Sequence, residues 1–218
     1  DLLVIQGTVV SAEHVTSQSE PLNLKSFVRQ LDIPVIVGGC ASYQAALHLM
    51  RTGAAGVLVG VGAGQASTTR SVLGVGVAQA TAIADVRGAR MRHLDETGVY
   101  VHLIADGGMV TGGDIAKALV CGADAVMIGA PLAAASDAPG QGWHWGIATG
   151  HAALPRSSRV PASPVGTLAE VLLGPAHTSD GHTNLMGALR HTMAMCGYET
   201  LKELQKAELM ITPATNAT

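Results

Sequence analysis

Short apolar runs alternate with segments of helical spacing along the first two thirds of the chain. Strand-like runs occur at Leu2–Gln6, Pro34–Gly38, Gly56–Gly60, Val101–Ala105 and Ala125–Gly129. Helical spacing occurs near Leu22–Gln30, Tyr43–Arg51, Ala82–Asp95 and Asp114–Val120. Because the strands are continuously apolar, the pattern predicts a parallel sheet that is buried on both faces.

One strand–helix–strand unit is present twice. Val35–Gly60 reads as an apolar strand, a double glycine, an amphipathic helix, a small-residue turn and a second strand closed by glycine, and Leu103–Gly129 repeats this order. Enzymes built from such units place their sites at the carboxyl ends of the strands. Both glycine clusters fall at such ends, so we expect the site there.

The last two glycine loops, followed by Pro131 in a short helical segment, match the phosphate site that a (β/α)8 TIM barrel forms after strands seven and eight. Counting back along the chain from strands seven and eight, Leu2–Gln6 is strand four of the barrel. The sequence therefore predicts an α/β fold, the C-terminal portion of a TIM barrel from about strand 4 to strand 8. We expect strands one to three to lie upstream, since five strands cannot close such a barrel.

Three parts of one domain are expected. Residues 1–138 form the partial barrel, residues 139–182 a long loop after strand 8, and residues 183–218 C-terminal helices with a tail. The first of these helices runs through Leu185, Leu189 and Met193, with its methionines as core filler. A second helix spans about Glu199–Glu208, and the tail Thr212–Thr218 is expected to fray.

Composition narrows the possible functions. The 218 residues are 48% hydrophobic and 13% charged, which suits a single globular domain. A net charge of −3 without a run of Lys or Arg predicts no nucleic-acid or membrane partner, and the absence of a long apolar segment or leader predicts a cytoplasmic protein. The three cysteines lack metal-type spacing and are expected to be buried free thiols.

Two loops have the character of a phosphate site. Asp106, Gly107 and Gly108 follow a strand and precede a helix, so their backbone N–H groups can meet an anion. Gly129 and Ala130, at the same depth on the next strand, offer further donors. Asp106 is placed to accept hydrogen bonds from ribose hydroxyls. The alternative is a tight turn with Asp106 as a cap.

The segment Gly60–Arg70 carries three alternating glycines. Such a loop can turn carbonyls inward, so Gly62, Gly64 and Ser67 are candidate ligands of a monovalent cation, or the loop can contact a flat ligand. A flexible loop is the alternative. The run does not open a Rossmann unit, since Ser-Thr-Thr-Arg rather than a helix is expected to follow it.

Several segments resemble the IMP dehydrogenase/GMP reductase family over nearly the whole chain. They are Gly60–Arg70, Gln79–Ala82, Val101–Gly108, Gly113–Leu119, Gly122–Gly129 and Ala138–Gly140. Further segments are most similar to the bacterial IMP dehydrogenase-like paralogue that lacks CBS domains, namely Trp143–Gly146, Gly174–His177, Asp180–Gly181, Asn184–Arg190 and Lys202–Glu208.

The resemblance implies a TIM barrel that acts on a purine nucleotide, either oxidising IMP to XMP with NAD or reductively deaminating GMP with NADPH. Both reactions pass through a covalent adduct between a cysteine and purine C2. The resemblance places Gln6, Gly60 and Gly62 on the nicotinamide cofactor (NAD or NADP) and Thr69 beside the nucleophile. It also implies a homo-oligomer, by family a tetramer. K+ is the candidate for the monovalent cation at Gly62, Gly64 and Ser67.

The sequence departs from the family where the chemistry occurs. Ser67 replaces the nucleophilic cysteine of the Gly-x-x-Cys-x-Thr pattern, and a hydroxyl needs a general base that a thiol does not. Gln6 stands where the dehydrogenases carry Asp, and Cys40 where they carry Asn. Gly150–Pro164 lacks the Arg-Tyr flap of the dehydrogenases, and no Ala-Glu-Gly segment of the reductases is recognisable.

Three hypotheses follow from these observations. The protein is an NAD(P)-dependent oxidoreductase of a purine nucleotide, a non-catalytic purine-nucleotide-binding paralogue, or an unrelated phosphate-binding TIM-barrel enzyme. A metal site built from histidines is not favoured, because their spacing does not repeat and most lie in predicted loops. These histidines are His102, His144, His151, His177, His182 and His191.

Overall fold

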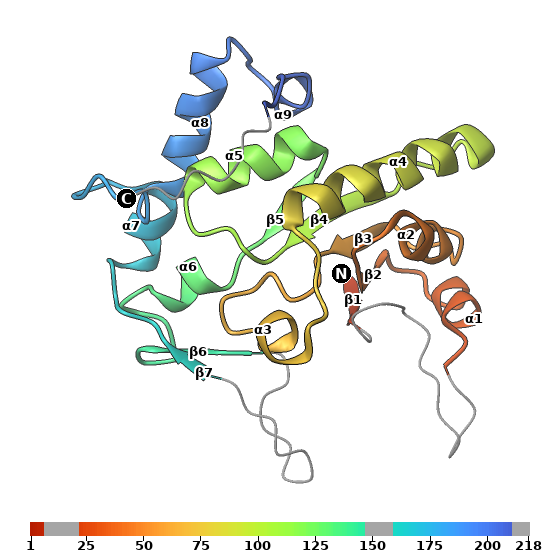
Figure 1. The fold of residues 1–218 in the computed structure, drawn as a ribbon, viewed down its shortest axis with the longest axis horizontal. Helices are drawn as coiled ribbons and strands as arrows, with labels where there is room; N and C mark the ends of the chain where they lie inside the picture. The colour runs from red at the N-terminus through yellow and green to blue at the C-terminus, as the bar shows by residue number, and fades with distance from the viewer. Residues whose placement is uncertain (7–21, 147–158, 211–218) are drawn as a thin grey trace, which may run out of the picture.

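A computed structural model describes residues 1–6, 22–146 and 159–210. Its centre is a five-stranded sheet in which all neighbouring strands are parallel (Figure 1). In spatial and chain order the strands are β1 (Leu3–Gln6), β2 (Val35–Cys40), β3 (Gly56–Val59), β4 (His102–Asp106) and β5 (Ala125–Met127). The five predicted strands and their parallel arrangement are confirmed.

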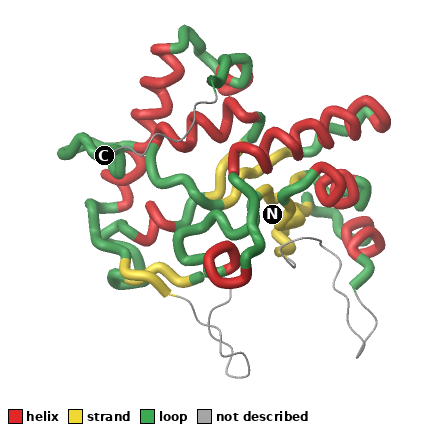
Figure 2. Tube along the Cα trace, in the orientation of Figure 1, coloured by secondary structure: helices red, strands yellow, loops and turns green. Residues whose placement is uncertain are grey.

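Four helices lie along one face of this sheet (Figures 1 and 2). They are α1 (Leu24–Arg29), α2 (Tyr43–Met50), α4 (Gln79–Thr97) and α5 (Gly112–Cys121). Val57 and Leu103 of the sheet are buried in one apolar cluster with Ile83 and Val86 of α4. Burial of alternate strand residues against amphipathic helices supplies the main hydrophobic stabilisation of the fold.

The other face of the sheet is packed through small residues. A Cβ atom added to Gly56 would lie 2.9 Å from Cδ1 of Ile104, and one added to Gly38 would overlap Cβ of Leu58. Glycines at these positions therefore let Leu58 and Ile104 fill the interior side of the sheet.

The sheet is open at both edges within the described residues. β1 pairs only with β2, and β5 only with β4. On β1, Val4 is 42% exposed. Five parallel strands with helices between them form part of a (β/α) barrel, because a closed barrel of this kind has eight strands.

The structure corrects the predicted loop at 139–182. Two antiparallel strands, β6 (Trp143–Trp145) and β7 (Arg159–Pro161), and the helix α7 (Leu168–Leu173) lie within it. The helix α6 (Ala130–Ala133), with Pro131 in its first turn, is as predicted. The prediction that no helix follows the glycine loop is wrong, because α3 spans Thr69–Leu73.

The C-terminal helices are shifted from their predicted bounds. α8 spans Leu185–Met195 and packs on α5, while α9 is limited to Leu201–Leu204. Met186 and Met193 pack against the core, but Met195 is 78% exposed, so its predicted core role is wrong. The tail from Thr212 lies outside the described residues.

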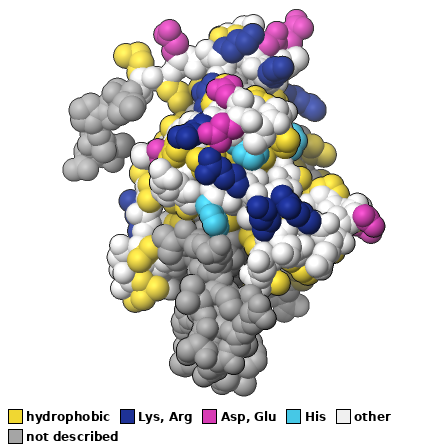
Figure 3. Space-filling view, turned by 90° about the vertical axis from the view of Figure 1, so that its right-hand side faces the viewer, with side chains coloured by type: hydrophobic (Ala, Val, Ile, Leu, Met, Phe, Trp, Pro, Cys, Tyr) yellow, Lys and Arg dark blue, Asp and Glu magenta, His cyan; other side chains and the backbone are white. Residues whose placement is uncertain are grey.

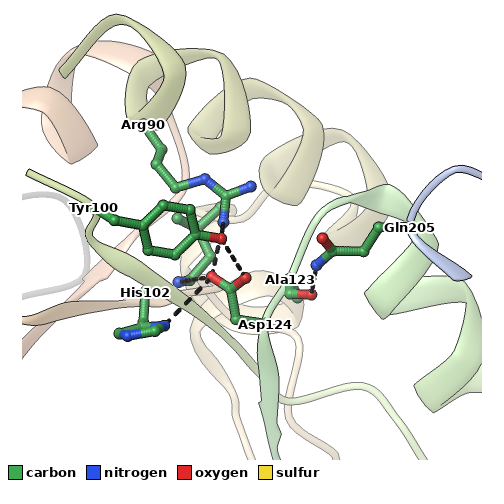
Figure 4. Close-up of polar contacts among 7 residues, drawn as sticks. Arg90, Tyr100, His102, Ala123, Asp124 and Gln205 are labelled. Carbon is green, nitrogen blue, oxygen red and sulfur yellow. Dashed lines mark hydrogen bonds and ion pairs between the residues drawn. The ribbon is translucent and has the colours of Figure 1, made fainter. Parts of the chain in front are cut away.

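A polar network joins α4 to the amino-terminal ends of β4 and β5 (Figure 4). Nη1 of the buried Arg90 lies 2.7 Å from the Tyr100 hydroxyl and 2.7 Å from Oδ2 of Asp124. Asp124 also accepts a hydrogen bond from the Leu103 N–H group. Burial and the hydrogen bond to Asp124 raise the pKa of Tyr100 to about 12.

The surface that Figure 3 shows carries Lys and Arg side chains interspersed with Asp, Glu and His. No helix in the described part of the chain is both long and apolar enough to cross a bilayer. Of the three cysteines, Cys40 is buried and Cys121 is half-buried, but Cys196 is exposed. The prediction of a buried thiol is therefore wrong for Cys196.

Candidate functional site

A cavity of about 530 Å³ opens at the carboxyl ends of the parallel strands. The loops after β3, β4 and β5 form most of its wall, and β1, β2 and the end of β6 complete it. Every site residue predicted from the sequence lies on this wall. These residues are Gln6, Gly60, Gly62, Gly64, Ser67, Thr69, Asp106, Gly107, Gly108, Gly129 and Ala130.

The loop after β4 lies directly against the loop after β3. Gly107 and Gly108 have φ angles of 86° and 82°, in the left-handed region that favours glycine. A Cβ atom on Gly107 would lie 2.8 Å from the Gly64 nitrogen, and one on Gly108 would lie 3.3 Å from the Ala63 oxygen. Both glycines are therefore required for loop packing, whatever ligand the loops bind.

The predicted phosphate donors are not equivalent. The N–H group of Gly107 donates to the carbonyl of Met127 at 3.3 Å and is already engaged. The N–H groups of Gly108, Gly129 and Ala130 donate to no residue in the described ranges. Gly129 and Ala130 begin α6, a helix of only four residues, so its dipole adds little to these individual donors.

Asp106 presents a carboxyl group to the cavity. Burial raises its pKa, because a partly dehydrated site disfavours the charged form. No ion pair joins this carboxyl to a described side chain. The group is thus kept unpaired at the cavity wall, where it can accept hydrogen bonds from ligand hydroxyls.

The glycine loop after β3 forms a turn around Ser67. The Ser67 N–H donates to the Gly64 carbonyl at 2.9 Å, and the Thr69 N–H donates to Oγ of Ser67 at 3.3 Å. No carboxylate or imidazole of the described chain is hydrogen-bonded to the Ser67 hydroxyl. Among the described residues, none is placed as the general base that an alkoxide nucleophile at Ser67 requires.

The cysteines do not supply a substitute nucleophile in this cavity. Cys40 donates from Sγ to the Leu58 carbonyl, and burial raises the pKa of its thiol to about 12. Burial also raises the pKa of Cys121, while Cys196 lies on the surface. None of the three is part of the described cavity wall.

Gly60 has a packing role in addition to the predicted cofactor contact. A Cβ atom there would overlap the backbone oxygen of Asp106. Gln6, at the end of β1, is paired in register with Gly38 and also lines the cavity. Gln6 and the Gly60–Gly62 segment thus belong to different parts of one wall.

Sequence reasoning missed Gln79, the first residue of α4. Its side-chain nitrogen donates to the Val59 carbonyl at 2.7 Å and to the Asp106 carbonyl at 3.2 Å. It therefore connects the ends of β3 and β4, from which the two glycine loops start. The one signal for it in the sequence is its place in the Gln79–Ala82 segment, since the predicted helical spacing begins only at Ala82.

His144 and the residues after it were also missed. His144, Trp145 and Gly146 line the cavity from the end of β6, within a segment predicted to be a loop. His151 and most of the segment Gly150–Pro164 lie outside the described residues. Within the described ranges, His, Cys, Asp and Glu form no group of three that could hold a metal ion.

Comparison with known proteins places this site in a family. Residues 2–149 match the model of the IMP dehydrogenase / GMP reductase domain. The chain belongs to the IMP dehydrogenase/GMP reductase family. Its fold and the predicted family are thereby confirmed, and the hypothesis of an unrelated TIM-barrel enzyme is excluded.

Relatives of several kinds share this domain. An uncharacterized oxidoreductase of Mycobacterium tuberculosis is 54% identical over 97% of this chain and 57% of its own length. The inosine-5'-monophosphate dehydrogenase of Methanocaldococcus jannaschii is 36% identical over 96% of this chain and 47% of its own. A crystal structure of an IMP dehydrogenase/GMP reductase-like protein from Corynebacterium glutamicum superposes with a TM-score of 0.85. It is 48% identical and covers 97% of this chain and 55% of that one. The chain thus spans about half the length of these relatives.

Proposed function

We propose that this protein is an NAD(P)-dependent oxidoreductase that acts on a purine 5'-monophosphate, IMP or GMP. The observation that carries the proposal is the convergence on one cavity of Asp106, the Ser67 loop, and the amides of Gly108, Gly129 and Ala130, which have no partner among the described residues. Its volume of about 530 Å³ falls in the range of small-ligand sites.

The cavity offers a binding group for each part of the nucleotide. The amides of Gly108, Gly129 and Ala130 hold the phosphate, because unpaired N–H groups are good phosphate ligands. The Asp106 carboxylate accepts hydrogen bonds from the ribose hydroxyls. The purine then lies toward the Ser67 loop, with Thr69 beside it.

A nicotinamide cofactor would supply the hydride acceptor or donor of the reaction. Gln6 and the loop from Gly60 to Gly62 would hold it on the rim of the cavity, where Gln6 offers both a donor and an acceptor. A K+ ion would take the carbonyls of Gly62, Gly64 and Ser67. The Gly64 carbonyl already accepts the Ser67 N–H, so only its second lone pair is free for the ion.

A second function is favoured by one specific observation. Ser67 has no general base among the described residues and no thiol lies on the cavity wall. The protein would then be a nucleotide-binding paralogue that performs no covalent chemistry.

On the basis of the family resemblance we also propose that the protein is a tetramer and that it is cytoplasmic.

Calorimetry with two matched ligand pairs tests the proposal. The intact protein should bind IMP more tightly than inosine, or GMP more tightly than guanosine, since the phosphate meets dedicated donors. Equal affinity within both pairs would contradict the phosphate site. Absorbance of NADH or NADPH during incubation with the preferred nucleotide then separates the oxidoreductase from the non-catalytic paralogue.

A further inference from the structure

The peptide group between Asp106 and Gly107 is held from two sides. Its carbonyl, the backbone oxygen of Asp106, accepts a hydrogen bond at 3.2 Å from the side-chain nitrogen of Gln79. Its N–H group, on Gly107, donates to the carbonyl of Met127 at 3.3 Å. The C=O and N–H groups of a trans peptide point in opposite directions. One contact therefore comes from the start of α4, and the other comes from the end of β5.

This peptide needs to be held because it precedes a glycine. The φ angle of Gly107 is 86°. Glycine adopts positive and negative φ angles about equally well, so the ψ angle of Asp106 and the φ angle of Gly107 can change together and turn the peptide over. On the side of β3, the register between β3 and β4 ends at Val59 and Ala105. The hydrogen bond from Gln79 thus acts where regular strand pairing has ended.

The side-chain amide of Gln79 is itself fixed in its orientation. Its nitrogen also donates to the Val59 carbonyl at 2.7 Å, so both of its hydrogens are engaged. Gly60 lies against the same amide, because a Cβ atom there would be 3.1 Å from the nitrogen and 3.1 Å from the oxygen. If the amide turned over, its oxygen would face two carbonyl oxygens. The donor is therefore directed to both strand ends.

The orientation of the peptide decides how the cavity presents its carboxyl group. Asp106 is the one carboxylate on the described cavity wall, and Gln79 does not belong to that wall. Rotation about the Cα–C bond of Asp106 changes the angle between its side chain and the loop that follows. A fixed peptide therefore keeps the carboxyl group in one place relative to this loop. Gln79 can act on a bound ligand only through Asp106.

We propose that Gln79 is a positioning residue that holds the Asp106–Gly107 peptide in one orientation and so places the Asp106 carboxylate for the ribose hydroxyls. This inference rests on the proposed function and adds to it a residue from outside the cavity wall. Without the donor of Gln79 the peptide populates both orientations, and the carboxylate meets the ribose in only part of the molecules. Discrimination in favour of the ribose hydroxyls is then lost.

A pair of nucleotides and a pair of variants test this role. Gln79→Met removes the donor and keeps the length of the side chain, and Gln44→Met, at an exposed position in the first turn of α2, is the matched control. Calorimetry at pH 8 compares IMP with 2',3'-dideoxy-IMP. Wild type and Gln44→Met should prefer IMP by about tenfold or more, as for a hydrogen bond to a charged group, and Gln79→Met by less than about threefold. A loss of stability alone would change both affinities by the same factor.

Hydrogen exchange of the ligand-free protein, followed by NMR, tests the same contact without a nucleotide. In wild type the side-chain amide hydrogens of Gln79 should exchange more slowly than those of the exposed Gln44. In Gln79→Met the Gly107 N–H should exchange about fivefold faster or more, as for loss of a neutral hydrogen bond. The Asp124 N–H, which donates to Leu103 at 2.8 Å at the other end of the β4–β5 pair, should keep its protection.

The outcomes separate this role from the proposed function. Equal binding of the two nucleotides by wild type would overturn the contact of Asp106 with the ribose, and the role of Gln79 with it. A wild-type preference for IMP that Gln79→Met retains would overturn the role of Gln79 alone. Unchanged exchange of the Gly107 N–H in this variant would show that Gln79 does not hold the peptide. Side-chain hydrogens of Gln79 that exchange as fast as those of Gln44 would show the same.

Discussion

The side-chain nitrogen of Gln79 lies 3.2 Å from the backbone oxygen of Asp106, across the gap between α4 and the end of β4. The same nitrogen donates to Val59 at the end of β3. One amide thus holds together the two strand ends that carry the cavity loops. The side-chain oxygen of Gln79 is buried and has no partner among the described residues, so both hydrogen bonds to the strand ends come from the side-chain nitrogen.

We predict that Gln79→Glu destabilises the protein by about 1–3 kcal/mol. A carboxylate would face two carbonyl oxygens without a proton to donate, and it would be partly buried. The free energy of unfolding, measured with urea at pH 7, should show this loss. Gln44→Glu on the exposed surface of α2 is the matched control and should change stability by less than about 0.5 kcal/mol. Equal effects of the two substitutions would contradict the bridging role of Gln79.

A second prediction separates backbone strain from loop contact. Gly107 and Gly98 both have positive φ angles, 86° and 72°. An added Cβ would press on Gly64 at position 107 but would meet nothing within 4 Å at position 98. Gly98→Ala should cost about 1–2 kcal/mol from strain alone, and Gly107→Ala should cost more. IMP affinity should fall only for Gly107→Ala. If Gly98→Ala weakened IMP binding equally, the loop contact would not be the cause.

A third prediction concerns the hydroxyl of Ser67. Because no general base contacts Ser67 among the described residues, wild type should form no covalent purine adduct that mass spectrometry can detect after incubation with IMP and NAD. Ser67→Cys should form one and should raise NADH or NADPH-linked turnover, because a thiol is partly ionised near neutral pH. Ser67→Ala is the control. Robust wild-type turnover that Ser67→Ala leaves unchanged would place the chemistry elsewhere.

The parts of the fold that were predictable are those fixed by local pattern. Continuous apolar runs identified β1 to β5, and the glycines at their ends located the cavity, because parallel strands direct their carboxyl ends to one side. The role of Gln79 was not predicted, because it depends on contacts between segments that are far apart in the sequence. The β6–β7 hairpin was not predicted, because its strands have only three residues each and show no clear periodicity. They are held together by the stacking of Arg159 against Trp143 and Trp145.

The same distinction applies to the residues of the site, of which some could be predicted from the sequence and others could not. Asp106 and the glycines around it follow apolar strands, so their positions on the wall could be anticipated. The availability of each donor could not, since the engagement of the Gly107 N–H by Met127 depends on the pairing of β4 with β5. His144 reaches the cavity only through the hairpin, and its orientation follows from the tertiary structure.

A fourth prediction concerns the network around Arg90 (Figure 4). Asp124→Asn should lower the free energy of unfolding by about 3 kcal/mol, because it leaves the charge of the buried Arg90 without its carboxylate. Asp95→Asn, at an exposed position on the same helix as Arg90, is the control and should have little effect. Urea unfolding at pH 7 measures both. A loss of the same size in Asp95→Asn would indicate a general charge effect and not the ion pair.

The last prediction is that Asp106→Asn stabilises the protein at neutral pH while it weakens nucleotide binding. Burial raises the pKa of Asp106 in the folded state above its value in the unfolded chain. The folded state therefore holds the proton more tightly, and this contribution to stability is lost as the pH rises through the folded-state pKa. Asn carries no charge, so the advantage of the variant should be absent near pH 3 and should grow as the pH rises above the pKa of an unfolded Asp, about 4, through the raised folded-state pKa. Urea unfolding at a series of pH values measures this difference in stability, with Asp95→Asn as the control.

The affinity of the Asp106→Asn variant for IMP should fall, because Asn offers the ribose one acceptor oxygen in place of a carboxylate. A variant that is less stable than wild type at pH 7 would mean that Asp106 is retained for structure and not for its ligand.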